Sequence, residues 1–418
     1  MTSTLYGNAS TNVLYQNEKF VPVHFISLHG GPATHFCAFS EALGKKGYTV
    51  TIWATEPAMK VCQARKIRAS ELNPNQVNLS SSDAVGVAQA VAEKLGDNLQ
   101  IVITDVGHIF AKSLHMAFAA YTPKVIHLAY YDNPEQDVPG GYNETAVAVM
   151  TQANGILFAN ANLSTIFNRQ LNRTCWRVGY YPLEQASELE NRRNNERIGL
   201  REKLLKEMSY LTTQEMQGRK VAVYLGGNNP EYFDEAFPAF MKMVQESAED
   251  YNNYIFIVQQ HPGAKKENKD GKLLKEFLKT GKALPIFISG WDVSADMIVA
   301  ADVVLYYQTS MGPQLALSNI PTIQIGHKIY NDILVRKGIS PSVTTSIGLK
   351  EALITMERPT DLNRFDRCLK LFEELGVSSQ WPDKLHTTLQ FYIDNPVIIP
   401  RKEEKTGKVK QMSKSVDF

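Results

Sequence analysis

Residues 294–325 read SADMIVAADVVLYYQTSMGPQLALSNIPTIQI, a stretch in which helical and strand patterns follow one another closely. We expect a helix over residues 294–300 and a strand over residues 302–307. A second helix over residues 310–318 and a second strand over residues 321–326 repeat the pattern. Short apolar runs of this kind are typical of parallel strands that helices cover on both faces. The stretch therefore predicts part of a parallel α/β sheet.

The same alternation extends from this stretch along most of the chain. Short apolar runs predict strands over residues 23–28, 48–54, 99–105, 124–131, 155–160, 176–181, 220–225, 254–259 and 285–289, with helical patterns between most of them. Strands that alternate with helices form parallel sheets. We therefore predict an α/β fold of two Rossmann-like β/α/β domains that face each other across a cleft. Ligands of such sheets bind at the carboxyl ends of the strands.

Composition and charge divide the chain into four parts. Residues 1–20 are polar and predict an N-terminal arm, and residues 21–182 carry the first series of strands and helices. A charged stretch then predicts a linker and an amphipathic helix, so that the second domain, with its C-terminal helices, covers residues 183–395. Residues 396–418 predict a flexible basic tail.

The 418-residue chain is almost neutral, with 44 Lys and Arg against 43 Asp and Glu. A net charge of +1 gives no bulk attraction to nucleic acid or to a membrane surface, so we predict neither as a partner. No apolar run approaches about 18 residues, and the first residues lack the apolar core of a signal peptide. We therefore expect no transmembrane segment and a cytoplasmic protein. The four cysteines are scattered without metal-ligand spacing, so we expect free thiols and no metal site.

A glycine-rich turn follows the first predicted strand, where residues 28–36 read LHGGPATHF. Glycines let the backbone approach a ligand closely, so Gly30 and Gly31 are candidates for contact with a bound donor. His35 would stand on the first turn of a helix that begins at Thr34, where its near-neutral pKa suits a general base. The alternative is an ordinary tight turn with a histidine at the start of a helix.

Asp105 ends the predicted strand over residues 99–105 of the same domain. A carboxylate at a strand end could orient His35 and stabilise its protonated form. One alternative is that Asp105 caps the next helix, and another is that His108 is the partner, which we rank second. We therefore predict His35 and Asp105 as the catalytic pair.

Four loops of the second domain place small and polar residues at strand ends. Residues 226–229 (GGNN) suit a loop over a phosphate, and His261, fixed by Pro262, could donate a hydrogen bond to one. Residues 289–294 offer a loop for a base, and residues 309–312 (TSMG) open a helix where N–H groups and hydroxyls suit a diphosphate. The predicted donor-binding residues of this domain are Gly227, Asn228, His261, Trp291, Ser294, Thr309, Ser310, Gly312 and Gln314.

These motifs resemble those of the GT-B glycosyltransferase superfamily, which includes the UDP-N-acetylglucosamine 2-epimerases. The shared pattern is a helix that ends in Ala-Asp, a strand, a Ser/Thr-Gly turn that opens a helix, and a Pro before the next strand. In this chain the pattern corresponds to residues 301–302, 309–312 and 319–321. The resemblance implies that residues 309–312 contact a donor diphosphate. It also places Gln314 near the position where many members hold a ribose with Glu.

Two further motifs are similar to those of known glycosyltransferases. Gly30, Gly31 and His35 match by spacing the glycine-rich turn of lipid-linked GlcNAc transferases and the His-bearing turn of small-molecule glycosyltransferases, in which a strand-end Asp supports the His. The His261-Pro262 pair resembles a motif of bacterial sialyltransferases, which use CMP-sugars. The resemblance implies a nucleotide-sugar substrate, linked to UDP, CMP or another nucleotide, and no separate cofactor.

From these observations we expect a metal-independent, inverting glycosyltransferase that moves a sugar from a nucleotide-sugar donor to an acceptor hydroxyl. His35 with Asp105 would deprotonate an acceptor bound by the N-terminal domain. Helix dipoles and His261 of the C-terminal domain would stabilise the leaving diphosphate. No motif identifies the acceptor or the oligomeric state.

Two alternatives use the same scaffold. An epimerase or hydrolase would need further acid–base carboxylates in the cleft, for which Asp132, Glu135 and Asp137 are candidates. These residues also suit a polar loop with a turn at residues 133–134, which we prefer. The other alternative is a protein that binds nucleotide sugars without turnover, since a fold does not guarantee activity.

Overall fold

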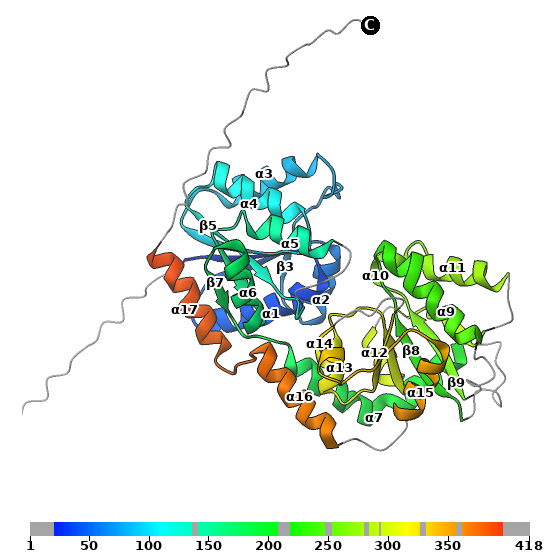
Figure 1. Cartoon of the computed structure of the whole chain (residues 1–418). Coiled ribbons are helices and arrows are strands. Elements are labelled where there is room, and N and C mark those ends of the chain that lie inside the picture. Colours follow the sequence, from blue (N-terminus) through cyan, green and yellow to red (C-terminus); the bar gives the residue numbers. More distant parts are fainter. Residues whose placement is uncertain are drawn as a thin grey trace, which may run out of the picture.

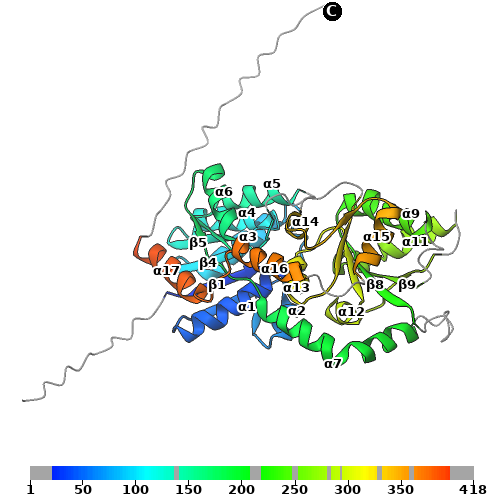
Figure 2. The same ribbon diagram turned by 60° about the horizontal axis from the view of Figure 1, so that its bottom comes forward.

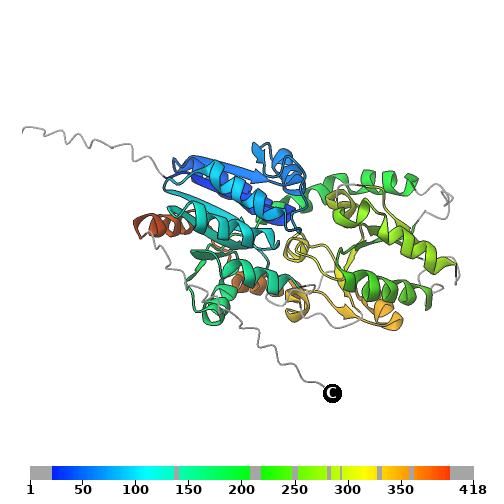
Figure 3. The same cartoon turned by 90° about the horizontal axis from the view of Figure 1, so that it is seen from above.

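A computed structural model of the chain describes residues 21–135, 141–207, 218–246, 253–279, 284–291, 294–326, 332–356 and 362–395. These residues form two domains, which lie side by side in Figure 1 and, seen from above, in Figure 3. Each domain is a parallel sheet with helices on both faces, so the predicted pair of Rossmann-like α/β domains is confirmed. The predicted arm and basic tail lie outside the described residues.

The N-terminal domain is built on a seven-stranded sheet whose strands all pair in parallel. In sheet order the strands are β3 (Ala69–Glu71), β2 (Val50–Ala54), β1 (Val23–Ser27), β4 (Gln100–Asp105), β5 (Val125–Tyr131), β6 (Gly155–Phe158) and β7 (Cys175–Arg177). The strand order changes direction between β1 and β4, so the loops after these two strands diverge. Such a switch point is the usual ligand site of an open parallel sheet.

Helices bury both faces of this sheet, which explains why its central strands are mostly apolar and buried at every position. The helices of the N-terminal segment are α1 (Gly30–Lys45), α2 (Glu56–Ala64), α3 (Ala84–Leu95), α4 (Phe110–Tyr121), α5 (Tyr142–Met150) and α6 (Ala161–Leu171). Side chains of α1 share one apolar cluster with β1, and side chains of α3, α4 and α5 form the cluster on the opposite face.

The C-terminal domain repeats this plan with a six-stranded parallel sheet. In sheet order the strands are β10 (Ile286–Ile288), β9 (Tyr254–Gln259), β8 (Lys220–Leu225), β11 (Val303–Tyr306), β12 (Thr322–Ile325) and β13 (Ser342–Val343). Here the order changes direction between β8 and β11. The loops after these strands, residues 226–229 and 307–312, therefore start at the second switch point.

The helical elements of the C-terminal half, apart from the last one, pack around this second sheet (Figure 1). They are α7 (Leu183–Glu207), the π-helix η1 (Tyr232–Ala236), α9 (Phe237–Glu246), α10 (Pro262–Lys265), α11 (Lys269–Leu278), α12 (Ser294–Ala300), α13 (Gly312–Leu317), α14 (Ile333–Arg336), α15 (Ser346–Met356), α16 (Leu362–Leu375) and α17 (Trp381–Asp394).

The charged stretch that the sequence suggests as a linker is the long helix α7, which runs along the C-terminal domain in Figure 2. Its arginines pair with acidic residues within α12 and just after its end. Arg192 contacts Asp296 at 2.7 Å, and Arg201 contacts Asp302 at 2.6 Å. These ion pairs therefore attach α7 to the C-terminal domain.

The last helix, α17, crosses back to the N-terminal domain, whereas the sequence assigned it to the domain over residues 183–395 (Figures 1 and 2). Its Tyr392 side chain fills the space above Gly155 of β6, where an added Cβ would lie 1.7 Å from the tyrosine oxygen. The Tyr392 hydroxyl also accepts a hydrogen bond from the Trp176 indole N–H at 3.0 Å. Because these contacts are between distant parts of the chain, no local pattern reveals them.

Candidate functional site

A cavity of about 620 Å³ lies between the two domains, at the carboxyl ends of the strands of both sheets. Its volume falls in the range of ordinary small-molecule sites, roughly 300–1,000 Å³. The side that belongs to the N-terminal domain is lined by His29, Gly107, Asn133, Pro134, Glu135, Gly141, Tyr142 and Thr145. The opposite side is lined by residues 225–229, 259–261, 307–313 and 332–334. Both switch points therefore open into this cavity.

His29 and Asp105 form a pair at the N-terminal switch point. His29 directly follows the strand end of β1 and precedes α1, and its Nδ1 atom lies 3.8 Å from Oδ1 of Asp105 at the end of β4. Asp105 is fully buried, and its Oδ2 accepts a hydrogen bond from the backbone N–H of Leu28 at 2.6 Å. Burial lowers the pKa of His29, but the nearby carboxylate of Asp105, together with the charge of Asp132, outweighs this effect and raises the pKa above the ordinary value.

Asp132 is a second carboxylate beside this pair. It follows β5, and Tyr142 donates a hydrogen bond to its Oδ1 at 3.4 Å. Burial, followed by repulsion from the charge of Asp105, raises the pKa of Asp132 to about 7. Asp132 is therefore a carboxyl group that exchanges its proton near neutral pH, and not simply a polar residue of a turn.

His35 lies in the core, away from the cavity that we expected it to face. Its ring is buried against Phe39, Tyr180 and Tyr181, and its Nδ1 atom is 2.7 Å from the Tyr130 hydroxyl. Burial, and next the charge of a nearby arginine, lower the pKa of His35 to about 3. A neutral, enclosed imidazole of this kind cannot reach a substrate in the cavity.

The physical reason for this difference is where α1 begins. The helix starts at Gly30 and includes the predicted turn, so that His35 falls on its second turn and faces the sheet. Gly30 and Gly31, which we predicted to contact a donor, are not among the residues that line the cavity. Gly31 lies beside Asp132: a Cβ added to Gly31 would be 3.2 Å from Oδ2 of Asp132. His108, the rival partner, accepts a hydrogen bond from the Phe110 N–H at 3.0 Å.

The loops of the C-terminal domain meet closely at the second switch point. Gly227 lies against the Tyr232 side chain, so that an added Cβ would be 2.6 Å from Cγ of the ring. Asn228 lies against Gly263 of the next loop, where an added Cβ would be 2.5 Å from Nδ2 of Asn228. The predicted loop residues Gly227 and Asn228 therefore line the cavity in a tight arrangement with little room for movement.

His261 lines the same side of the cavity, as predicted. Its Nδ1 atom accepts a hydrogen bond from the backbone N–H of Gly263 at 3.1 Å, which caps the short helix α10. Burial, and next the positive charge of His29, lower the pKa of His261. In the neutral ring the proton then resides on Nε2, which makes this atom a hydrogen-bond donor.

Residues 309–312 also line the cavity, with Thr309 Oγ1 accepting a hydrogen bond from the Met311 N–H at 3.1 Å. Two other predicted donor contacts are placed elsewhere. The Trp291 indole faces α7, donating to Glu207 at 2.6 Å, and Gln314 is buried in α13 and does not line the cavity. Ser294 begins α12, and its side chain lies outside the described part of the chain.

Within the ranges that the structure describes, His, Cys, Asp and Glu side chains nowhere gather in a group of three or more that could hold a metal ion. Among the same residues, no helix combines the length and apolar character that crossing a bilayer requires. The candidate Asp137 of the alternative reading lies outside the described residues.

No known family model and no curated protein sequence matches the chain. Solved structures do match over most of its length. UDP-GlcNAc 2-epimerase from Neisseria meningitidis bound to UDP-GlcNAc is similar with a TM-score of 0.63 and 11% identity, over 90% of this chain and 100% of that one. S. aureus MnaA in a co-structure with UDP is similar with a TM-score of 0.61 and 12% identity, over 90% of this chain and 97% of that one.

A third match is UDP-GlcNAc 2-epimerase from Methanocaldococcus jannaschii in complex with UDP-GlcNAc and UDP. It gives a TM-score of 0.59 and 13% identity, over 88% of this chain and 99% of that one. Identities this low show a shared fold. The expectation of a GT-B fold, with its likeness to epimerases, is therefore confirmed.

Proposed function

We propose that this chain is an enzyme that binds a nucleoside-diphosphate sugar in the interdomain cavity and acts on the sugar by acid–base chemistry, as an epimerase does. The observation that carries this proposal is Asp132, a carboxyl group with a pKa of about 7 beside the His29–Asp105 pair. Titratable groups whose pKa values are strongly shifted by burial and by a neighbouring charge are candidates for the acid–base groups of active sites.

The C-terminal side of the cavity supports the nucleotide part of the proposal. It presents the hydroxyls of Thr309 and Ser310, the Nε2 atom of neutral His261, and the backbone of residues 226–228. Hydrogen-bond donors at strand ends are the groups that bind a diphosphate. We infer that these residues hold the diphosphate and that the sugar extends toward Asp132.

The N-terminal side supports the acid–base part. Epimerisation at a carbon atom needs one group to remove a proton and another to return a proton on the opposite face. His29, whose pKa is raised, lines this wall of the cavity, and Asp132, whose charge acts on His29, precedes the lining residue Asn133. Buried Asp105 lies 3.8 Å from the imidazole. The similar structures that contain UDP and UDP-GlcNAc make UDP-sugars the first substrates to test.

A second candidate is the metal-independent, inverting glycosyltransferase. The His29–Asp105 pair favours it, because a histidine held by a buried carboxylate suits removal of a proton from an acceptor hydroxyl. In this reading His29 takes the place that we predicted for His35. His261 would donate a hydrogen bond to the leaving diphosphate.

A binding and product assay separates these candidates. Thermal shifts with UDP, GDP, TDP, CMP and their sugars identify the nucleotide, since a ligand of the folded state raises Tm. Proton NMR then follows the bound sugar, with and without EDTA. A changed sugar configuration without an acceptor supports the epimerase, and release of nucleotide only with an acceptor supports the transferase. A Tm shift without any product indicates a binding protein, and no shift contradicts both activities for this panel.

A further inference from the structure

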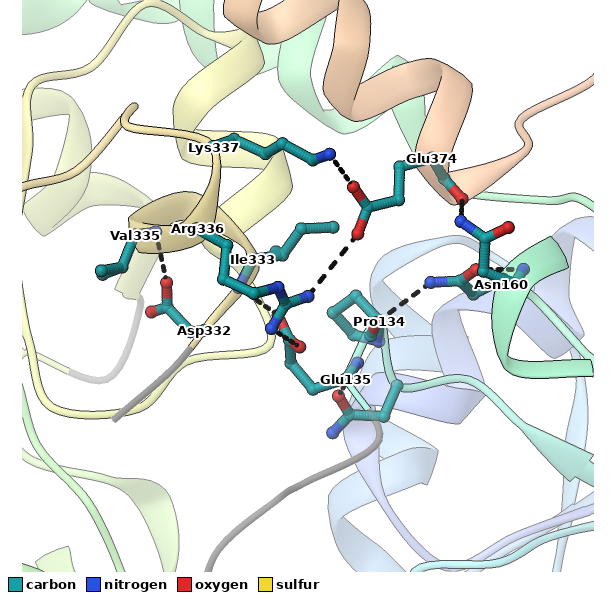
Figure 4. A network of polar contacts seen from close by, with 11 residues as sticks. Pro134, Glu135, Asn160, Asp332, Ile333, Val335, Arg336, Lys337 and Glu374 are labelled. Carbon is teal, nitrogen blue, oxygen red and sulfur yellow. Dashed lines mark hydrogen bonds and ion pairs between the residues drawn. The ribbon is translucent and has the colours of Figure 1, made fainter. Parts of the chain in front are cut away.

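The loop after β5 extends from the acid–base site to the other domain. It carries Asp132 and, three residues later, Glu135. One carboxylate oxygen of Glu135 accepts a hydrogen bond from the backbone N–H of Ile333, the first residue of α14 in the C-terminal domain. The other oxygen accepts from Nη1 of Arg336 at 2.9 Å (Figure 4). A single side chain thus binds both a backbone group and a charged group of the opposite domain.

The same loop is held firmly within its own domain. The Tyr131 hydroxyl donates to the Glu135 carbonyl at 2.6 Å, and the Glu135 N–H donates to Oδ1 of Asn133 at 2.9 Å. Asn160, at the N-terminus of α6, donates from Nδ2 to the Pro134 carbonyl at 3.0 Å (Figure 4). Because these hydrogen bonds fix the loop within its domain, a displacement of the Glu135 carboxylate would also displace the segment that contains Asp132.

The α14 side of the contact is fixed as well. Asp332 caps this short helix by accepting from the Val335 N–H at 2.8 Å, and Lys337 pairs with Glu374 of α16. Arg336 also lies 3.6 Å from Glu374, which therefore shares the arginine with Glu135 (Figure 4). The linked residues include both walls of the cavity, since Glu135 lines one side and residues 332–334 line the other.

Burial makes this link energetically significant. The Glu135 side chain is 9% exposed, so its charge depends on Arg336 and on the Ile333 N–H for compensation. Arg336 is 34% exposed and also pairs with Glu374, so the cost of breaking the link falls on the buried carboxylate, whose loss of a partner costs more than loss of a fully exposed salt bridge. Separation of the domains in the intact protein would impose the same loss.

We propose that Glu135 is a positioning residue whose contacts with Ile333 and Arg336 hold the two domains at one separation and thereby set Asp132 against the ligand bound by the C-terminal domain. Glu135 does not touch the reacting atoms in this role. The catalytic consequence rests on the proposed function, whereas the domain link itself does not. Small displacements of reacting groups are costly, since about 1 Å can lower the rate roughly a hundredfold.

The test compares Glu135→Ala with Glu374→Gln in the full-length chain. The second variant is a matched control, because Glu374 also contacts Arg336 but does not line the cavity. Three quantities are measured: amide exchange of residues 332–336, the radius of gyration from small-angle X-ray scattering, and kcat and KM for the substrate identified above. Glu135→Gln, which keeps an acceptor for Ile333 but loses the charge for Arg336, serves as the milder variant.

For Glu135→Ala we expect faster exchange at α14, a larger radius of gyration, and a fall in kcat of roughly ten- to a hundredfold, while nucleotide affinity changes less than about threefold. Glu135→Gln should lie between wild type and Glu135→Ala. A folded Glu135→Ala protein with unchanged exchange and radius overturns the proposal. So does a Glu374→Gln protein that shows the same losses. If the wild type turns over no nucleotide sugar, the proposed function fails, and exchange and scattering still decide whether Glu135 links the domains.

Discussion

The Nδ1 atom of His29 faces Oδ1 of Asp105 at 3.8 Å across the β1–β4 switch point, while the other oxygen of Asp105 is held by the Leu28 N–H. The strand order produces this pair, because β1 and β4 are neighbours in the sheet although about 75 residues separate them in sequence. The imidazole is thus placed by a buried carboxylate and still faces the cavity. Under the proposed function, His29 is therefore the histidine that we expect to act on the substrate.

Replacing His29 should therefore affect catalysis, and replacing His35 should affect folding. His29→Ala should lower kcat by about two powers of ten or more, as loss of a general base does, with nearly unchanged nucleotide affinity. His35→Ala should leave the substrate contacts in place but lower Tm, because it removes a buried ring and its contact with the Tyr130 hydroxyl. Kinetics and thermal unfolding of both variants check this.

The reverse pattern would contradict the assignment. A His35→Ala enzyme that folds with normal Tm but has lost its turnover would return the catalytic role to His35. A His29→Ala enzyme that loses affinity and turnover equally would make His29 a binding group.

Asp132→Asn should change the pH dependence of both activity and stability. The pKa of this buried carboxyl is raised to about 7 from an ordinary value of 3.8, so wild-type kcat/KM should change with a midpoint near pH 7. The folded protein keeps a proton between about pH 4 and 7 that the unfolded chain releases, so the free energy of unfolding decreases as the pH rises through this window. Asparagine removes both effects.

We therefore expect Asp132→Asn to be more stable than the wild type at pH 8, nearly equal to it at pH 4, and much less active at both. Denaturant unfolding at the two pH values and a pH–rate profile measure this. Glu135, whose burial also raises its pKa to about 7, supplies a similar trend that remains in the variant. An unchanged difference between wild type and variant across pH 4–8 would show that Asp132 titrates normally.

The strands could be predicted from the sequence because burial on both faces leaves a continuous apolar run. The predicted strand over residues 99–105 corresponds to β4 (Gln100–Asp105), which is buried at every position. Two short edge strands, β3 (Ala69–Glu71) and β13 (Ser342–Val343), had no prediction, because they are only partly buried and carry no such run. Their presence depends on pairing with a neighbour that is distant in sequence.

The site was predicted less completely than the strands. One reason is a misplaced helix start, and the other is that some contacts join residues far apart in the sequence. Gly30-Gly31-Pro32 is typical of a turn, yet Pro32 fits the first turn of α1, where a missing N–H breaks no helical bond. Because we read these residues as a turn, we predicted that the helix begins at Thr34, four residues too late. We therefore chose His35 and not His29 as the catalytic histidine. The rule that ligands meet strand ends would have found His29 and would have favoured Asp132, an epimerase candidate for which we preferred a polar loop. No sequence pattern reveals the contact of Glu135 with Ile333.

Gly227→Ala should weaken nucleotide binding about tenfold or more. The new Cβ would lie 2.6 Å from Cγ of Tyr232, and that ring is held because its hydroxyl donates to Asp270 at 2.6 Å. The loop over the ligand must therefore move away. Calorimetric titration with the nucleotide found by thermal shift measures the change, where tenfold corresponds to about 1.4 kcal/mol.

Gly86→Ala in α3 is the matched control for that substitution. An added Cβ at Gly86 meets no atom within 4 Å, so affinity should stay unchanged and stability should rise by up to about 1 kcal/mol from improved helix propensity. If Gly227→Ala binds the nucleotide like Gly86→Ala does, the loop over residues 226–229 is not part of the nucleotide site.

Tyr392→Ala should destabilise the N-terminal domain, although the residue lies near the C-terminal end of the described chain. Tyr392 is buried against Gly155 and hydrogen-bonded to Trp176, so truncation leaves a cavity under β6 and should cost about 3–5 kcal/mol of unfolding free energy. Its neighbour Phe391 is 41% exposed, and Phe391→Ala should cost clearly less. Urea unfolding compares the two variants, and amide exchange locates the loss. Faster exchange in β6 and β7 is expected; faster exchange confined to β8 and β9 would mean that α17 stabilises the C-terminal domain instead.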